Sequence, residues 1–270
     1  MLPENKHITP LDARRIKPSD NIERDQALFY MKAEYEMTLT EVMTRGNIST
    51  LIGRAKGRKS FLVKLLIASM KGYRDEQFRS DVTGRVALFD TEQAQYHVWR
   101  GTKQIEQMVN GWPVDLDVFG LRPDNTSDRI SLIENYIYMN DPQVVFIDGI
   151  RDLITDINDA TQATDIVGKL MKWSHEKKCH ICCVLHQNKQ DDNARGHIGT
   201  EIVNKSETVI SINKIAGDSY YSEVKSVYTR GHEIKEFQFS IENGLPVVKH
   251  DQVKAFERQY EPSKEEAPFL

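Results

Sequence analysis

Apolar and polar positions along the chain alternate between short apolar runs and longer amphipathic stretches. Apolar runs of strand length lie at 48–52, 85–90, 116–121, 143–148 and 179–186. Stretches with the period of an amphipathic helix follow the first four runs, at 59–70, 94–109, 124–138 and 161–177. Because strands that alternate with helices form parallel sheets, the pattern predicts an α/β fold with a doubly wound, mostly parallel sheet and helices on both faces.

Beyond Glu207 the chain has strand-like runs with no helical stretch between them. Turn-forming pairs such as Asn243-Gly244 separate these runs, which span 207–213, 220–228, 234–241 and 245–248. We expect them to extend the parallel sheet with antiparallel strands.

The two ends of the chain differ from its middle. Residues 1–25 show no apolar period and predict an extended arm, whereas residues 26–44 predict a helix. The stretch 261–270 is rich in proline and charge, which predicts disorder. Its Pro-Phe tip is similar to the tips with which single-strand-binding proteins recruit partners, and a solubilising end is the alternative.

Composition restricts the class of protein. Of 270 residues 39% are hydrophobic and 28% are charged, and the formal net charge is -4 with a pI near 6.1. No stretch approaches the ~20 apolar residues of a membrane span, and the first 25 residues are too polar for a signal peptide, so we expect a cytoplasmic protein with no membrane partner. The negative net charge argues against a predominantly basic surface that binds duplex DNA constitutively, but it is compatible with a local basic channel.

Three cysteines gather in one short segment. Cys179 and Cys182 have the spacing of a zinc-binding pair, with His180 and His186 nearby, but a second ligand pair at that spacing is missing. They lie in an apolar run, which favours cysteines packed in a buried strand.

The loop between the first strand and the first helix reads GRAKGRKS. A polyphosphate needs several backbone N–H donors at once, which a tight turn that leads into a helix N-terminus supplies. Lys59 would reach the outer phosphates and the Ser60 hydroxyl would meet Mg²⁺. Arg58 stands where the pattern has its last glycine, so a basic turn without nucleotide is the alternative. The expected nucleotide-binding residues are Gly53, Arg54, Ala55, Lys56, Gly57, Arg58, Lys59, Ser60 and Phe61.

Two carboxylates follow predicted strands. Asp148 ends the run that starts at Val144, at the edge where parallel sheets bind ligands, and would hold Mg²⁺. Glu92 follows the strand after the first helix and is the candidate base for the attacking water. An ordinary strand-ending acid is the alternative for Asp148, and an acid at a helix N-terminus is the alternative for Glu92.

Four motifs occur in order: the loop 53–60, Asp90-Thr-Glu92-Gln, Phe146-Ile-Asp148-Gly and Val184-Leu-His186-Gln187-Asn. Together they resemble the RecA-like P-loop ATPases over residues 45–242, especially the RepA-type and DnaB-type hexameric helicases. The arginine before the lysine-serine pair is similar to a subgroup found on mobile genetic elements. The resemblance implies a RecA-like fold, ATP and Mg²⁺ as ligands, and domain limits of 1–44 for the arm and helix, 45–249 for the ATPase domain and 250–270 for the tail.

The resemblance also implies roles for single residues. Lys59 and Glu92 would be catalytic, His186 or Gln187 would sense the γ-phosphate, and Arg230 would reach the site of a neighbouring subunit. Tyr228 stands where a lysine often precedes that arginine, which leaves a solvated turn arginine as the alternative.

The segment 188–197 follows the sensor strand, where the family places a loop that contacts single-stranded DNA. Lys189 and Arg195 would neutralise phosphates there, although Asp191 and Asp192 weaken the charge and a plain mobile loop is the alternative.

These features lead to three hypotheses. The first is an ATPase motor or loader that acts on DNA in replication or transfer of a mobile element. It would work as a ring, with a hexamer as one expected form, and with single-stranded DNA and replication or transfer proteins as partners. The second is a nucleotide-gated regulatory protein with weak or no hydrolysis, and the third, which has least support, is a filament-forming recombination mediator.

Overall fold

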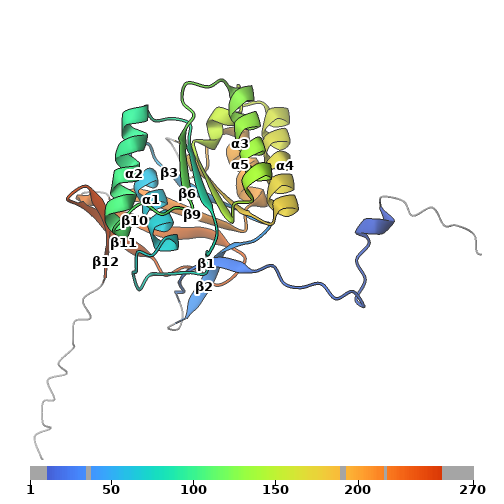
Figure 1. Cartoon of the computed structure of the whole chain (residues 1–270), viewed down its shortest axis with the longest axis horizontal. Coiled ribbons are helices and arrows are strands. Elements are labelled where there is room, and N and C mark those ends of the chain that lie inside the picture. The colour runs from blue at the N-terminus through green and yellow to red at the C-terminus, as the bar shows by residue number, and fades with distance from the viewer. Residues whose placement is uncertain (1–10, 35–37, 189–192, 216–217, 251–270) are drawn as a thin grey trace, which may run out of the picture.

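The computed structural model describes residues 11–34, 38–188, 193–215 and 218–250 (Figure 1). Residues 11–26 run away from the body of the molecule as an arm with a short 3-10 turn, η1 (Asp12–Arg14). The predicted extended arm is thus confirmed for these residues. The first ten residues and the predicted disordered end, 261–270, lie outside the described residues.

A nine-stranded sheet forms the centre of the described molecule. Its order is β12-β11-β10-β9-β3-β8-β7-β5-β6, and the strands from β9 to β6 are parallel, whereas β10, β11 and β12 are added in antiparallel fashion. This order confirms the predicted RecA-like sheet, and it confirms the antiparallel extension for β10, β11 and β12. The first of the four strands expected to be antiparallel, β9, is instead parallel to β3. The strands are β3 (Ile48–Gly53), β5 (Val86–Asp90), β6 (Leu116–Gly120), β7 (Val144–Asp148), β8 (His180–His186), β9 (Thr208–Ile215), β10 (Asp218–Thr229), β11 (Phe237–Glu242) and β12 (Leu245–Lys249).

Helices cover both faces of this sheet, as predicted (Figure 1). The helices α1 (Lys59–Met70) and α2 (Gln95–Val109) pack into one apolar core, and α3 (Thr126–Asn140), α4 (Ala160–Lys177) and α5 (Gly196–Lys205) pack into the other. Asn125 caps α3, because its side-chain oxygen accepts a hydrogen bond from the Asp128 N–H.

The predicted helix over 26–44 is wrong. These residues hold β1 (Ala27–Lys32) and β2 (Leu39–Thr44), which form a small antiparallel sheet with β4 (Phe78–Ser80) in the order β2-β1-β4. The register of β1 against β2 shifts on both sides of Phe29, so the consecutive residues 27–29 are all buried. Such a bulge hides the two-residue alternation by which a strand is recognised.

The helix α5 has no counterpart among the predicted helices. Its sequence GHIGTEIVNK contains two glycines, which weaken any helix prediction. Ile198 and Ile202 are fully buried in the core shared with α4, and this tertiary packing stabilises the helix. Gly196 and His197, which were placed in the predicted loop, therefore belong to the first turn of α5.

No helix among the described residues combines the length and the apolar character that a membrane span requires.

Candidate nucleotide-binding site

The P-loop leaves the centre of the parallel sheet. The strand β3 lies between β8 and β9, and the loop after it leads into α1, which starts at Lys59. A Cβ atom on Gly53 would lie 2.2 Å from the Ile212 carbonyl oxygen, and one on Gly57 would lie 2.9 Å from the Arg54 carbonyl oxygen. Both glycines are therefore required, because the loop rests directly on backbone atoms of β9 and of the loop itself.

Arg58 adopts the left-handed conformation that favours glycine, with φ 72° and ψ 24°. The cost of this conformation for a residue with a Cβ is about 1–2 kcal/mol. Its Nη1 atom donates a hydrogen bond of 2.6 Å to the Tyr220 carbonyl oxygen on β10. The unusual arginine therefore links the P-loop to the antiparallel part of the sheet.

Lys59 folds back over the loop. Its Nζ atom lies 2.9 Å from the Gly53 oxygen, 3.0 Å from the Arg54 oxygen and 3.0 Å from His186 Nδ1. Burial lowers the pKa of the lysine, and the neighbouring Asp148 and Glu92 oppose that shift. The ammonium thus lies in the mouth of the loop, where the phosphates of a nucleotide would approach.

The ends of four parallel strands meet at this edge of the sheet. Gly53 pairs with His186, and Asp90 pairs with Asp148 on the neighbouring strand. Glu92 follows Asp90 by two residues, and its Oε1 atom lies 3.5 Å from His186 Nε2. His186 therefore stands between Lys59 and Glu92, and the three side chains form one polar cluster at the predicted γ-phosphate position.

Glu92 has the properties of a carboxylate held in its charged form. The hydrogen bond from His186 lowers its pKa most, and the charges of His186, Lys59 and Arg151 act in the same direction against burial. The side chain is partly exposed, so water can reach it. An ionised, accessible carboxylate at this position can orient and deprotonate a water molecule.

Asp148 and Ser60 provide oxygen ligands of the kind that Mg²⁺ prefers. The Ser60 hydroxyl is hydrogen-bonded to the buried Asp148 carboxyl. Burial raises the pKa of Asp148 to about 6, with a further contribution from Asp90 and Glu92. A buried carboxyl that is costly to ionise gains from a divalent cation beside it, so these residues fit the metal.

The turn that carries Glu92 is held by residues that the sequence analysis quoted but gave no role. Asp90 accepts hydrogen bonds from the N–H groups of Glu92 and Gln93, at 3.1 and 2.7 Å. The Thr91 hydroxyl donates to the Gly149 carbonyl oxygen at 2.9 Å. Aspartate two or three residues before an N–H group is the signal for such a turn, and it was present in Asp90-Thr-Glu92-Gln.

Lys64 is a further charged residue that the sequence analysis missed. It lies one turn after Ser60 on α1, and its Nζ atom donates to Gln104 Oε1 at 2.5 Å. Burial lowers its pKa to about 8, while Asp148 and Asp90 oppose the shift. A lysine inside an amphipathic helix normally indicates a solvated face, so the sequence carried no signal for this position.

Not all predicted residues come together in one chain. Gln187 is buried beside the P-loop, with its N–H 3.1 Å from the Gly53 carbonyl oxygen. Arg195 is exposed at the start of α5. Arg230 follows β10 at the opposite edge of the sheet, where its N–H donates to the Glu207 carbonyl oxygen beside the start of β3. The roles of Arg195 and Arg230 stay predictions, and Lys189 lies outside the described residues.

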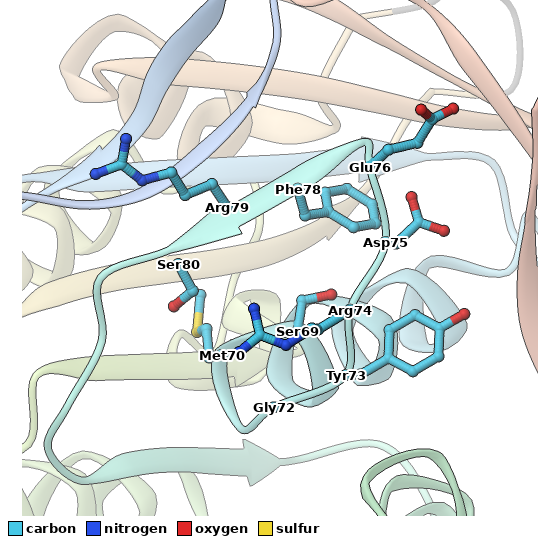
Figure 2. Close-up of a pocket in the computed structure, with 10 residues that line it drawn as sticks. All are labelled: Ser69, Met70, Gly72, Tyr73, Arg74, Asp75, Glu76, Phe78, Arg79 and Ser80. Atoms are coloured by element: carbon cyan, nitrogen blue, oxygen red, sulfur yellow. The ribbon is translucent and has the colours of Figure 1, made fainter.

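A hollow at that opposite edge lies between the end of α1 and β4 (Figure 2). Arg74 and Arg79 line it together with Asp75 and Glu76, so its charges balance. Because α1 begins at the P-loop and ends at this hollow, the hollow lies a helix length away from Lys59. It is therefore not part of the nucleotide site.

The cysteines are packed in the core, as the favoured interpretation predicted. All three cysteines are fully buried: Cys179 directly precedes β8, and Cys182 and Cys183 lie within it. Burial raises the pKa of the Cys179 and Cys182 thiols to about 12. They serve as small apolar side chains between the two helical layers.

Comparison with known proteins identifies the family. Residues 17–192 match the model of a family described as AAA domain, and the match includes the P-loop, Glu92, Asp148 and His186. A search of curated proteins gives no match. The matched stretch covers more than half of the chain and the site within it has the geometry derived above, so the chain belongs to the AAA domain family and is a P-loop ATPase.

Proposed function

We propose that the protein binds ATP with Mg²⁺, hydrolyses it, and uses the cycle to act on single-stranded DNA as a helicase or loader in replication or transfer of a mobile element. The observation that carries hydrolysis is the cluster of Lys59, His186 and Glu92 at the end of the P-loop strand. A protein that only stores nucleotide needs the loop, whereas an ionised carboxylate beside it serves the attack of water.

Each residue of the site would have its own role in ATP hydrolysis. The N–H groups of the P-loop and the Lys59 ammonium would hold the phosphates, and Glu92 would accept the proton of the water that attacks the γ-phosphorus. The Lys59 ammonium, which now donates to His186 Nδ1, would turn to the γ-phosphate. His186 would then donate a hydrogen bond from a ring N–H to the same phosphate, so that the strand β8 senses occupancy. Mg²⁺ at Ser60 and Asp148 would neutralise charge on the phosphates.

The segment that follows β8 supports a coupling between the nucleotide site and DNA. His186 is followed by the segment that ends at Arg195, whose N–H donates to the His186 carbonyl oxygen at 3.0 Å. A change in His186 on loss of the γ-phosphate would therefore be transmitted to the start of α5. In this proposal Lys189 and Arg195 contact phosphates of the DNA strand.

Ring assembly is part of the same proposal. Arg230 is too far along the sheet to serve the site of its own chain, so it would act on the site of a neighbour in a ring, with six subunits as the expected number. The partners would be single-stranded DNA, further copies of this chain, and replication or transfer proteins.

A second function is supported by a different observation. Arg58 keeps a left-handed backbone at a position where glycine would be free of strain, and Tyr228 replaces the lysine that often precedes the arginine acting in trans. Both features favour a nucleotide-gated switch that binds ATP and hydrolyses it slowly.

One assay separates the two functions. ATP turnover is measured with and without single-stranded DNA for wild type, Lys59→Ala and Glu92→Gln, and ATP binding is measured in parallel. A motor shows turnover that DNA stimulates and that both variants lose, with ATP binding kept in Glu92→Gln. Tight ATP binding with background turnover in wild type, with or without DNA, would establish the switch instead.

The role of Arg230 is tested by mixing inactive proteins. Arg230→Ala and Lys59→Ala are combined at several ratios, and their assembly is followed by light scattering with and without ATP. Partial recovery of turnover is expected, because mixed interfaces pair an intact P-loop with an intact arginine. Assembly without any recovery would contradict action in trans.

A further inference from the structure

A second hollow lies beside the P-loop, on the side of β9 and β10. Its volume is about 540 Å³. Loop residues 54–57 form one wall, and residues 213–215 with Glu223 and Lys225 form the other. We call it the basic pocket.

Positive charge is concentrated in the basic pocket. Arg54, Lys56, Lys214 and Lys225 line the pocket with the single carboxylate of Glu223, which gives a formal net charge of +3 for the lining. The Glu223 carboxylate forms an ion pair with Lys225 at 3.0 Å. The chain as a whole has a formal net charge of -4. Such a local excess in an otherwise acidic protein attracts anions to one place on the surface.

The walls of the basic pocket are joined by hydrogen bonds. The Arg54 N–H donates to Asn213 Oδ1 at 3.2 Å, and Arg58 Nη1 donates to the Tyr220 carbonyl oxygen at 2.6 Å. The hydrogen bond to β10 helps to hold Arg58 in its left-handed backbone conformation. Arg54, Lys56 and Lys214 nevertheless keep their side chains exposed, so the charge faces solvent.

The same four loop residues separate the basic pocket from the phosphate site. An anion held in the pocket would be one loop thickness away from the N–H groups that bind phosphates. Nine of the described residues line the pocket, and none of these nine is aromatic. These features suit a small polyphosphate better than a nucleic-acid strand, which needs an extended charged track and rings for its bases.

We propose that the basic pocket captures the polyphosphate of the incoming nucleotide and passes it to the P-loop. This inference rests on the nucleotide binding of the proposed function. The pocket accelerates association by raising the local concentration of nucleotide, and it leaves dissociation nearly unchanged because the P-loop provides the contacts of the final complex.

The size of the effect follows from the charge that is removed. Charged clefts raise association rates by about 10- to 1,000-fold. The double variant Lys214→Gln/Lys225→Gln removes two of the four cations without touching the P-loop, so the association rate is expected to fall about three- to tenfold at low salt. The difference shrinks in high salt, because the screening length drops from about 30 Å at 0.01 M to about 3 Å at 1 M.

A matched variant controls for net charge. Lys169→Gln/Lys172→Gln removes the same two charges from the exposed face of α4, outside the basic pocket. Stopped-flow fluorescence with ATP labelled on the ribose gives association and dissociation rates for wild type and both double variants at several salt concentrations. Equal thermal unfolding of the three proteins shows that the folds are intact.

The expected result is slower association in the pocket variant alone, with a dissociation rate within about twofold of wild type. Equal association rates in the two double variants would overturn the inference. Competition with tripolyphosphate and with a deoxythymidine oligonucleotide identifies the anion. If the pocket variant is no longer inhibited by the oligonucleotide but is still inhibited by tripolyphosphate as wild type is, the pocket binds nucleic acid and the inference is overturned.

The failure of this inference differs from that of the proposed function. If wild type binds no labelled ATP, or binds it equally well after Lys59→Ala, the proposed nucleotide site itself fails. If Lys59→Ala abolishes binding and the pocket variant associates like its control, only the inference on the basic pocket fails.

Discussion

The buried carboxyl of Asp148 should make the protein less stable than it would be with a neutral residue there. Its pKa is raised from 3.8 to about 6, chiefly by burial. A carboxyl whose pKa is higher in the folded state binds its proton more tightly there than in the unfolded state, so stability falls as pH rises from 3.8 to about 6 and is constant above. At about 1.4 kcal/mol for each pKa unit, the total loss is about 3 kcal/mol.

The substitution Asp148→Asn tests this reasoning. Asparagine keeps the shape of the side chain and can still accept the hydrogen bond from Ser60, but it never ionises. Without nucleotide and Mg²⁺, the variant should be more stable than wild type by roughly 1–3 kcal/mol at pH 8 and by about half of that at pH 5. The range allows for relaxation around the site.

Urea unfolding at the two pH values measures the difference. Comparing the proteins at the same pH cancels the titration of all other groups. The variant should also lose Mg²⁺-dependent ATP turnover, because a neutral amide is a poor ligand for the cation. A variant less stable than wild type at pH 8, or a difference equal at both pH values, would refute the argument that burial of the charge dominates at this position.

Three further predictions concern the loop and the base. Gly53→Ala should lose about 1–3 kcal/mol of stability and all ATP binding, because its Cβ would lie 2.2 Å from the Ile212 carbonyl oxygen. The control Gly168→Ala, on the exposed face of α4, places its Cβ where no atom lies within 4 Å and should be at least as stable as wild type. Denaturant unfolding compares the two variants, and equal stability would contradict the close packing at Gly53. Arg58→Gly should keep the free energy of unfolding within about 1 kcal/mol of wild type, because relief of the backbone strain offsets the lost hydrogen bond to the Tyr220 carbonyl oxygen. A loss above about 2 kcal/mol in denaturant unfolding would show that the hydrogen bond contributes more than the strain costs. Glu92→Gln should lower ATP turnover, measured by phosphate release, about 100- to 10,000-fold. ATP affinity, measured by equilibrium binding, should stay unchanged. Turnover near the wild-type rate would show that Glu92 is not the base.

The sequence by itself determined the parallel core and most of the nucleotide site. The strands β3, β5, β7 and β8 are apolar runs buried on both faces, and each is followed by a polar residue at the strand end. Both signals are local, so they can be read without knowledge of the partner strands. The glycines of the P-loop and the order of the motifs then place Lys59, Glu92, Asp148 and His186 at one edge of the sheet.

Tertiary structure alone decided the features that depend on distant partners. The strand β1 exists because it pairs with β2 and with β4, which lies more than 40 residues further along the chain, and its bulge conceals the alternation. The helix α5 is stable because its apolar face packs against α4, despite two glycines. The burial of Lys64 against Gln104 and the position of Arg230 at the far edge likewise follow from packing between segments, which no local pattern records.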